Sequence, residues 1–294
     1  MPELSAPIRV TWDLPADPAR VRPLWRRLQD GRVLLVDANV APEGSGALTE
    51  LAGALAEEPG PRLSLTAPGT VAAAAVEALG TEARGREVSL LPPHSDEAVV
   101  RWTSAGAAVT PSVWSTPEGL SSLPKALIVA SQHGLSAVSI MNPHAPAEPL
   151  KPGDRAAAAA AWRASGLEGR VVVRCHDLFL AEVLGLDPFS GYTGCQAAGY
   201  LAHVDSGGRL VACRTLPQVL GDLSTVALAE LWNGRRLRRL RAVLEAAPAP
   251  CTACAVAASC CGGCRGLAAD LGRDPGCSGS RERAPRAGDA GRAQ

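Results

Sequence analysis

Cysteine is the residue type in this sequence whose placement indicates chemistry most directly. Five of the nine cysteines lie between residues 251 and 264, beside Gly262 and Gly263. Soft thiolates packed this closely are typical ligands of iron–sulfur clusters or zinc, and glycines let the backbone approach such a centre. The block therefore predicts a metal centre. The other four cysteines are also in the C-terminal part of the chain: Cys175, Cys195, Cys213 and Cys277.

A disulfide framework is the competing interpretation of the same cysteines. Such frameworks belong mainly to small secreted chains. This chain has 294 residues, enough for one large core or two smaller ones. Its first residues lack the basic and apolar regions of a secretory signal. We therefore expect a reducing, cytoplasmic setting in which the thiols stay free for metal.

Charge and hydropathy argue against two classes of partner. The 29 basic and 29 acidic residues balance, so no overall field draws the protein toward nucleic acid or a membrane surface. No apolar run approaches the roughly 18 residues that a membrane-spanning helix needs. Aromatic residues make up only 3% of the chain, so alanine carries much of the apolar content, which favours helices.

The part of the chain before the cysteines alternates short apolar runs with helical stretches. The runs predicted as strands are 8–14, 33–37, 63–66, 88–91, 107–114 and 137–141. The stretches predicted as helices are 17–29, 46–57, 70–79, 115–134 and 155–164. One more helix, with the weakest pattern of the six, is expected after the fourth strand. Six strand–helix repeats imply a parallel sheet with right-handed crossovers. A partial barrel and an open doubly wound sheet both fit, and either would place a site at the carboxyl ends of the strands.

Those strand ends carry few groups suited to catalysis. Asp13, Asp37, His94 and His144 could in principle form a metal or acid–base site. Isolated polar residues at strand ends are more often helix caps or solvated loop groups. Neither a GxGxxG motif after the first strand nor a GxxxxGK(S/T) phosphate loop occurs.

The C-terminal part predicts a small structure that gathers cysteines. One more strand is expected at 170–175, followed by a connector. Residues 201–205 and 209–213 flank a Ser-Gly-Gly turn and predict a β-hairpin, which would bring Cys195 and Cys213 within reach of one site. Asp154 and Ser224 are expected to cap the helices that follow them.

Two further stretches have little apolar periodicity. Five arginines between residues 235 and 241 form a basic run, which we interpret as a solvated helix face, with an acidic partner or an RNA backbone as the minority alternative. The last residues, 281–294, are rich in Gly, Arg and Ala and are predicted to be disordered.

The cysteines also follow a longer pattern. Twelve residues separate Cys195 from Gly208, and four more separate Gly208 from Cys213. The dense block reads C-x2-C-x5-C-x3-C, and Cys277 follows after twelve further residues. This seven-cysteine pattern, over roughly residues 190–280, resembles the SPASM domain, the C-terminal auxiliary-cluster domain of many radical S-adenosylmethionine (SAM) enzymes. Two stretches agree with the same family, Leu220-Gly221-Asp222-Leu223 and Cys261-Gly262-Gly263-Cys264-Arg265.

The resemblance implies two [4Fe–4S] clusters, each with its own thiolates. The ligands of the first cluster would be Cys195, Cys213 and Cys264. The ligands of the second cluster would be Cys251, Cys254, Cys260 and Cys277. Cys175 or Cys261 could be the fourth ligand of the first cluster, or that position could stay open for another ligand. Zinc is the alternative metal, although seven cysteines fall short of two four-thiolate sites unless His176 or His203 joins them.

The resemblance also implies a partial (β/α)6 barrel before the cysteine-rich domain. In radical SAM enzymes the SAM-binding cluster sits on C-x3-C-x2-C just after the first strand. That place is occupied here by residues 13–18, and no cysteine precedes Cys175. The glycine-rich SAM-binding element after the second strand is replaced by residues 39–44. We therefore expect a degenerate barrel without a SAM site over 1–170, a connector over 171–194, a SPASM domain over 195–280 and a tail over 281–294.

Radical SAM-like proteins with an intact SPASM domain and no SAM-cluster motif accompany active radical SAM enzymes. The sequence resembles the SPASM-domain protein of the GeoRSP systems. The neighbours there are a radical SAM/SPASM enzyme and a small PqqD-like peptide-binding protein, which suggests peptide modification. The expected function is an accessory iron–sulfur protein that passes electrons to such an enzyme, or scaffolds it, and does not cleave SAM by itself. A zinc-stabilised interaction module and an enzyme that binds substrate at an open cluster iron are the alternatives.

Overall fold

The computed structural model describes residues 4–58, 60–144, 147–186, 195–268 and 270–279. The predicted tail over 281–294 and the last part of the predicted connector, 187–194, lie outside the described residues. None of the helices in the described ranges combines the length and the apolar character needed to cross a bilayer.

Strands and helices alternate from the N-terminal end, as the sequence predicts. The strands are β1 (Arg9–Asp13), β2 (Leu35–Asn39), β3 (Arg62–Pro68), β4 (Glu87–Leu91), β5 (Ala108–Trp114), β6 (Ala137–Met141) and β7 (Val172–Cys175). The helices between them are α1 (Val21–Asp30), α2 (Ser45–Glu57), α3 (Ala72–Leu79), α4 (Asp96–Ser104), α5 (Pro117–Ser121), α6 (Leu123–Gln132) and α7 (Pro152–Ala164). The C-terminal part adds α8 (Leu178–Val183), β8 (Leu201–Val204), β9 (Arg209–Cys213), β10 (Leu216–Asp222), α9 (Leu228–Trp232), α10 (Arg235–Glu245) and α11 (Ala257–Cys260).

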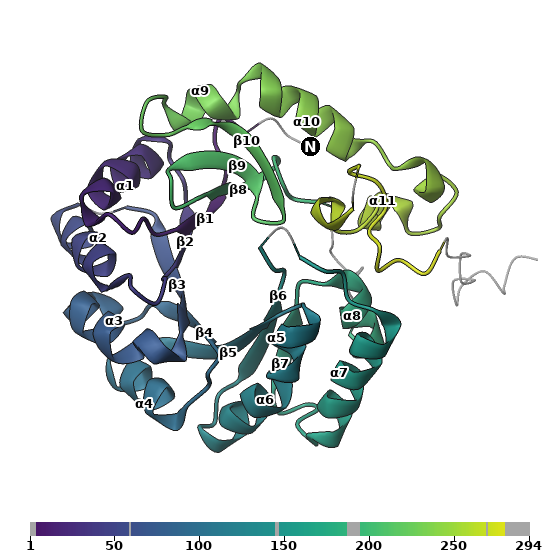
Figure 1. The fold of residues 1–294 in the computed structure, drawn as a ribbon, viewed down its shortest axis with the longest axis horizontal. Coiled ribbons are helices and arrows are strands. Elements are labelled where there is room, and N and C mark those ends of the chain that lie inside the picture. Colours follow the sequence, from purple (N-terminus) through teal and green to yellow (C-terminus); the bar gives the residue numbers. More distant parts are fainter. Residues whose placement is uncertain (1–3, 59, 145–146, 187–194, 269, 280–294) are drawn as a thin grey trace, which may run out of the picture.

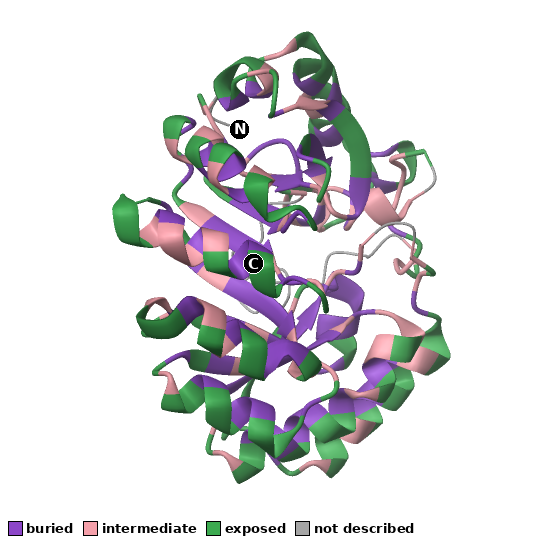
Figure 2. Ribbon diagram, turned by 60° about the vertical axis from the view of Figure 1, so that its left-hand side comes forward, coloured by how far each residue is buried: buried purple, intermediate pink, exposed green. Residues whose placement is uncertain are grey.

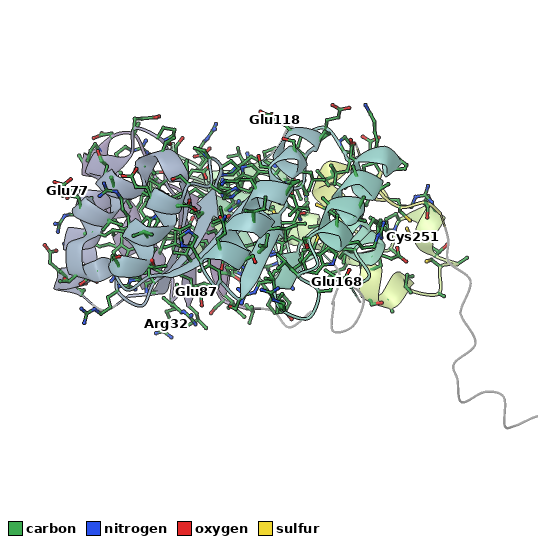
Figure 3. All side chains as sticks on the ribbon, turned by 90° about the horizontal axis from the view of Figure 1, so that it is seen from below. Arg32, Glu77, Glu87, Glu118, Glu168 and Cys251 are labelled. Atoms are coloured by element: carbon green, nitrogen blue, oxygen red, sulfur yellow. The ribbon has the colours of Figure 1, made fainter. Side chains whose placement is uncertain are left out.

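The sheet is a partial barrel rather than a doubly wound sheet. Among the described residues it has the order β10-β9-β8-β1-β2-β3-β4-β5-β6-β7, and β1 to β7 are parallel and follow one another without a reversal of order. Without a reversal, right-handed crossovers place the helices on one face. Figure 1 shows α1 to α7 outside the curved sheet. In Figure 3, one edge of the sheet carries Arg32 and Glu168, which precede β2 and β7, and Glu87, the first residue of β4. Glu118, which follows β5, lies at the opposite edge.

The two faces of the strands differ in polarity. Side chains toward the helices are apolar and buried, among them Val10, Trp12, Val36, Ala38, Leu63 and Leu65. Burying one such Val or Leu contributes about 1.5–3 kcal/mol, and this face forms the core against the helices (Figure 2). The alternate positions are largely polar and line the interior of the barrel, among them Arg9, Asp37, Ser64, Thr66 and Ser89. Because side chains alternate between the two faces of a strand, apolar residues pack between the sheet and the helices, and polar residues face the barrel interior.

The C-terminal hairpin extends the barrel sheet. β8 pairs with β1 in parallel, so β1 lies between β2 and β8. β8 and β9 are antiparallel, which confirms the predicted hairpin, and Asp205 Oδ1 accepts a hydrogen bond of 2.8 Å from Arg209 N in its turn. Gly208 adopts a φ of 78° in that turn, a conformation that favours glycine. β10 pairs with β9 and was not expected from the sequence.

Several local predictions differ from the structure. Helix α7 starts at Pro152 with Lys151 as its N-cap, and Asp154 bonds back to Lys151 N at 2.8 Å from the first turn. The N-cap position of α9 is Ala227, which makes no side-chain capping bond, whereas Ser224 bonds to the Asp222 carboxylate. The predicted connector contains β7 and α8 in its described part.

The basic run lies on α10, as expected. Leu237, Leu240 and Leu244 form its buried stripe, while Arg241 donates to Ala198 O at 2.6 Å and lies over the Trp232 ring. The other arginines of the run are exposed, which agrees with a solvated helix face.

Candidate metal centre

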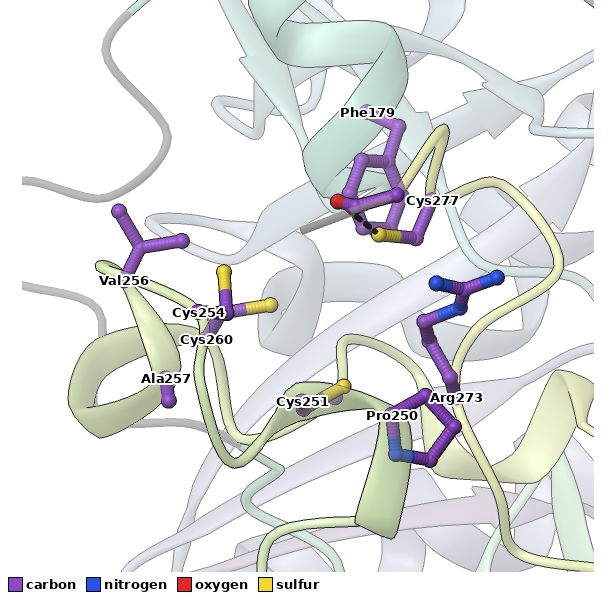
Figure 4. Close-up of a pocket in the computed structure, with 11 residues that line it drawn as sticks. Phe179, Pro250, Cys251, Cys254, Val256, Ala257, Cys260, Arg273 and Cys277 are labelled. Atoms are coloured by element: carbon purple, nitrogen blue, oxygen red, sulfur yellow. Dashed lines mark hydrogen bonds between the residues drawn. The ribbon is translucent and has the colours of Figure 1, made fainter. Parts of the chain in front are cut away.

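The four thiols predicted for the second cluster line a single pocket. Cys251 comes from the turn after α10, Cys254 and Cys260 flank the start and end of α11, and Cys277 comes from near the end of the described chain. Figure 4 shows the four sulfurs turned toward the space between them. Phe179 of α8 also lines this pocket and packs with Cys260 and Cys277. The predicted connector therefore supplies one wall of the site.

Three successive residues with positive φ shape the backbone beside Cys260. They are Cys261, Gly262 and Gly263, with φ of 48°, 89° and 75°. The turn directs the N–H groups of both glycines at the Cys260 sulfur, which lowers the thiol pKa, while burial raises it more strongly. A Cβ on Gly263 would lie 2.6 Å from Asp274 Cβ. The glycines in the dense block are therefore needed both for the left-handed turn and for the close packing of Gly263 against Asp274.

Two of the three thiols predicted for the first cluster meet at Thr215. The Thr215 hydroxyl lies 3.4 Å from Cys213 Sγ and 3.6 Å from Cys264 Sγ. Burial, opposed by the hydrogen bond to Thr215 and helped by the neighbouring Cys213 and Cys195 thiols, raises the pKa of Cys264 to about 12. Burial likewise raises the pKa of Cys195 to about 11, opposed by hydrogen bonds from the backbone of Ala197 and Arg265. These three thiols therefore influence one another, although they come from distant parts of the sequence.

Two buried charged residues hold the cysteine block to the rest of the protein. The Asp274 carboxylate accepts hydrogen bonds from Cys264 N at 2.8 Å and Gly276 N at 2.7 Å. The Arg265 guanidinium, in a residue only 3% exposed, donates to the backbone carbonyls of Val243, Leu244, Ala246, Cys261 and Leu271. Because three of these carbonyls lie at the C-terminal end of α10, Arg265 also meets the negative end of that helix dipole.

The two cysteines considered as extra ligands lie outside the pocket around the second set. Cys261 Sγ lies 3.6 Å from Ala258 O at the C-terminal end of α11. Cys175 Sγ lies 3.3 Å from Asp177 O at the end of β7 and packs against the core around α6 and α7. Burial raises the pKa of the Cys175 thiol well above its usual range.

The chemistry of these residues fits a thiolate-bound metal. All nine cysteines are described and free, so none forms a disulfide. Ionising buried thiols beside one another is unfavourable unless a cation compensates the charge, and binding a metal would release their protons. Soft thiolate sets of this kind suit iron–sulfur clusters and zinc.

The strand ends bring together two of the four residues considered there, and add a third. Asp13 Oδ2 lies 3.2 Å from His203 Nε2 and 3.9 Å from His144 Nδ1. Asp37 instead pairs with Arg9 and Ser64 inside the barrel. His94 is buried, and its Nε2 lies 3.1 Å from Leu90 O and 3.0 Å from Ser112 O, apart from that group.

His203 was not named for this group, because only the pairing of β8 with β1 brings it there. Desolvation of the His144 imidazole, together with the charge of Arg214, lowers its pKa to about 4. Hydrogen bonding to His203 lowers the pKa of Asp13 despite the opposing effect of burial.

A polar cavity of about 330 Å³ occupies the barrel interior. Its walls include Arg9, Asp37, Arg174, His176 and Arg214. Cys213, one of the three thiols predicted for the first cluster, also lines this cavity. Arg214 links the two regions, because it follows Cys213, reaches Asn39 Oδ1 at 3.4 Å and lies 5.4 Å over the Trp114 ring.

Comparison with known proteins agrees with this architecture. Residues 195–255 match the SPASM family model, described as an iron–sulfur cluster-binding domain. SuiB from Streptococcus suis superposes with a TM-score of 0.66 at 14% identity, over 93% of this chain and 78% of that chain. Native anSMEcpe with bound AdoMet and a Cp18Cys peptide superposes with a TM-score of 0.62 at 13% identity, over 90% and 92% of the two chains. No curated protein matches the sequence.

The fold is thus an α/β partial barrel of the radical SAM type, as predicted. Residues 195–255 form an iron–sulfur-binding SPASM domain at its C-terminal side.

Proposed function

We propose that this protein is an iron–sulfur accessory protein with two auxiliary [4Fe–4S] clusters. It would transfer electrons to, or scaffold, a radical SAM enzyme that modifies a peptide. The observation that carries the proposal is the single pocket lined by Cys251, Cys254, Cys260 and Cys277. Four thiols around one space match the ligand number of a [4Fe–4S] cluster.

The proposed first cluster is held by Cys195, Cys213 and Cys264. Its support is the contact of two of these thiols with Thr215 and the mutual effect of all three on the Cys264 pKa. Because Cys213 also lines the barrel cavity, an enzyme that binds substrate at an open iron of this cluster is the second candidate function.

The residues around the thiols would tune these clusters. A bound [4Fe–4S] cluster supplies one-electron transfer. Backbone N–H groups directed at Cys260 and Cys195 would stabilise negative charge on sulfur and raise the reduction potential. These N–H groups belong to this chain, so their effect on the reduction potential does not depend on a partner protein.

The first strand supports the proposed accessory role. β1 ends at Asp13, and no cysteine precedes Cys175 in the sequence. Three thiolates after this strand would be needed for a cluster that binds and cleaves SAM, so we propose that the protein acts with an enzyme that has them. The similarity to GeoRSP proteins suggests a radical SAM/SPASM enzyme and a PqqD-like peptide-binding protein as partners in a reducing cytoplasm.

Anaerobic purification with iron and sulfide analysis tests the proposal. Two [4Fe–4S] clusters give about eight irons per chain, and incubation with SAM and reductant should yield no 5′-deoxyadenosine. Cys254→Ser and Cys213→Ser should each remove about half of the iron, and the double variant nearly all of it.

Cys261→Ser is the matched control, because its thiol lies outside the pocket. It should retain the iron of the second cluster, which Cys254→Ser should lose. Zinc in place of iron would identify a zinc-stabilised module instead, and SAM cleavage by the isolated protein would overturn the accessory role. A substrate-dependent change in the EPR spectrum that Cys213→Ser removes would favour the open-iron enzyme.

A further inference from the structure

Three metal-ligating side chains meet at the carboxyl ends of β1 and β6 and on β8, away from the cysteine block. One ligand atom from each of Asp13, His144 and His203 lies within 4.8 Å of the other two. We propose that these residues form a second kind of metal site, in which two histidines and one carboxylate bind a divalent first-row transition ion such as Zn²⁺. The proposal does not depend on what the cysteines bind.

His203 is held so that Nε2 faces Asp13. Thr11 Oγ1 lies 2.8 Å from His203 Nδ1 and 3.5 Å from Ala202 O, so when the hydroxyl donates to Ala202 O its oxygen accepts from His203 Nδ1–H. In that arrangement Nε2 keeps its lone pair. A metal-binding histidine commonly has its other ring nitrogen fixed in this way. The His203 side chain is only 5% exposed, so water has little access to it.

Asp13 is positioned in the same manner. Asn39 Nδ2 donates to Asp13 Oδ1 at 2.6 Å, which leaves Oδ2 for the two histidines. Arg214 in turn contacts Asn39 Oδ1, and its positive charge interacts with Asp13 and Asp37. The carboxylate is therefore oriented by the residue beside it in the neighbouring strand.

The convergence of three groups favours a metal over a shared proton. In that tautomer His203 Nε2 and Asp13 Oδ2, which lie 3.2 Å apart, are both acceptors, and a cation between them would stabilise the pair. A proton would satisfy that pair alone, whereas His144 Nδ1 approaches the same oxygen at 3.9 Å. Ligands about 2.0–2.2 Å from one ion lie about 3–3.5 Å apart, so His144 needs a small inward shift. Its half-exposed side chain has ring contacts with Trp114 and His203 only, within the described residues.

Three protein ligands leave coordination positions open for water or a ligand oxygen. Asn142, two residues before His144, lines the barrel cavity, and its buried Oδ1 has no hydrogen-bond partner among the described residues. Arg214 lines the same cavity. The proposed site thus adjoins the large polar space of the barrel interior that these residues share.

The test uses the full-length protein, purified anaerobically with whatever metal its cysteines hold. Equilibrium dialysis against buffered Zn²⁺ is followed by metal analysis of the wild type, Asp13→Asn and His144→Ala. We expect the wild type to take up one zinc more per chain than either variant, and each variant to bind that zinc at least about 10-fold more weakly. Asp13→Asn is informative because asparagine could still hydrogen-bond to His203 and Asn39.

The matched control is the surface pair Asp96 and His133, which are 2.9 Å apart and belong to no group of three possible ligands within the described part of the chain. Asp96→Asn/His133→Ala should take up as much zinc as the wild type. The difference in zinc X-ray absorption between wild type and Asp13→Asn should show nitrogen and oxygen at about 2.0–2.2 Å and no sulfur at about 2.3 Å. Equal zinc uptake by the wild type, Asp13→Asn and His144→Ala, or sulfur in the difference spectrum, would overturn the proposal. Neither result would change the iron content bound by the cysteines, which is measured separately and tests the proposed function.

Discussion

At the scale of single residues, Arg265 joins the cysteine block to α10. Its guanidinium donates to Ala246 O at 3.0 Å and Val243 O at 3.2 Å, among other carbonyls. We expect Arg265→Ala to lower the free energy of unfolding by about 3–5 kcal/mol, because several buried carbonyls lose their donor. Urea denaturation under anaerobic conditions measures the change.

Arg209 provides the comparison for that variant. It forms an ion pair with Asp205 and its side chain is 59% exposed, so Arg209→Ala should cost less than about 1 kcal/mol. Equal losses for the two variants would contradict the role assigned to Arg265.

We expect His94 to make the free energy of unfolding sensitive to acid. Both partners of Nε2 are carbonyls, so this nitrogen carries the proton, and buried Nδ1 has no partner among the described residues. Burial lowers the pKa of His94 below its usual 6.5. As the pH falls below 6.5, the unfolded chain takes up a proton that the folded protein resists, so stability present above pH 6.5 is progressively lost.

His94→Gln keeps an N–H donor for the two carbonyls but does not titrate. The variant should therefore lose less stability on acidification, by at most about 1.4 kcal/mol per pH unit. Unfolding free energies measured at several pH values between about 7.5 and 5 would show this, and parallel curves for wild type and variant would refute it.

At the scale of elements, the turn between β9 and β10 must approach the segment after Cys264 closely. A Cβ on Gly266 would lie 2.5 Å from Thr215 O. Gly266→Ala should therefore push Thr215 away from Cys213 and Cys264 and lower the iron content by up to about half, with the second set of thiols unaffected. Gly153→Ala in α7 is the control, since nothing lies within 4 Å of its Cβ position. Full iron loading of Gly266→Ala would contradict this account.

The elements were mostly predictable from local patterns, and the sites less so. Apolar runs located β1 to β7 because each strand buries one face against a helix. Helix α4 had the weakest pattern because Asp96, Glu97 and Arg101 leave only Ala98, Val99 and Trp102 buried. The grouping of Cys213 with Cys264, and of His203 with Asp13, depends on packing between distant segments. The periodicity of a single segment cannot predict contacts between distant segments.

At the scale of the whole molecule, β1 is central to the sheet. Ala202 of β8 pairs with Val10, so a proline there removes a donor inside the sheet. We expect Ala202→Pro to cost about 3 kcal/mol or more, measured as lost soluble yield and a lower urea midpoint. Val219→Pro in edge strand β10, where the register already shifts, should be milder. A milder effect of Ala202→Pro would show that the sheet does not depend on this pairing.

The pairing of β1 with β8 also has a consequence for synthesis. Thr11 and His203, which meet across these strands, are 192 positions apart. At about 5–20 residues per second, β1 emerges roughly 10–40 s before its partner strand. During that interval one edge of the first strand made is unpaired, and such edges invite association with other chains. The nascent barrel therefore completes its sheet only when the ribosome has begun the cysteine-bearing domain, so chain completion and metal-site assembly are coupled in time.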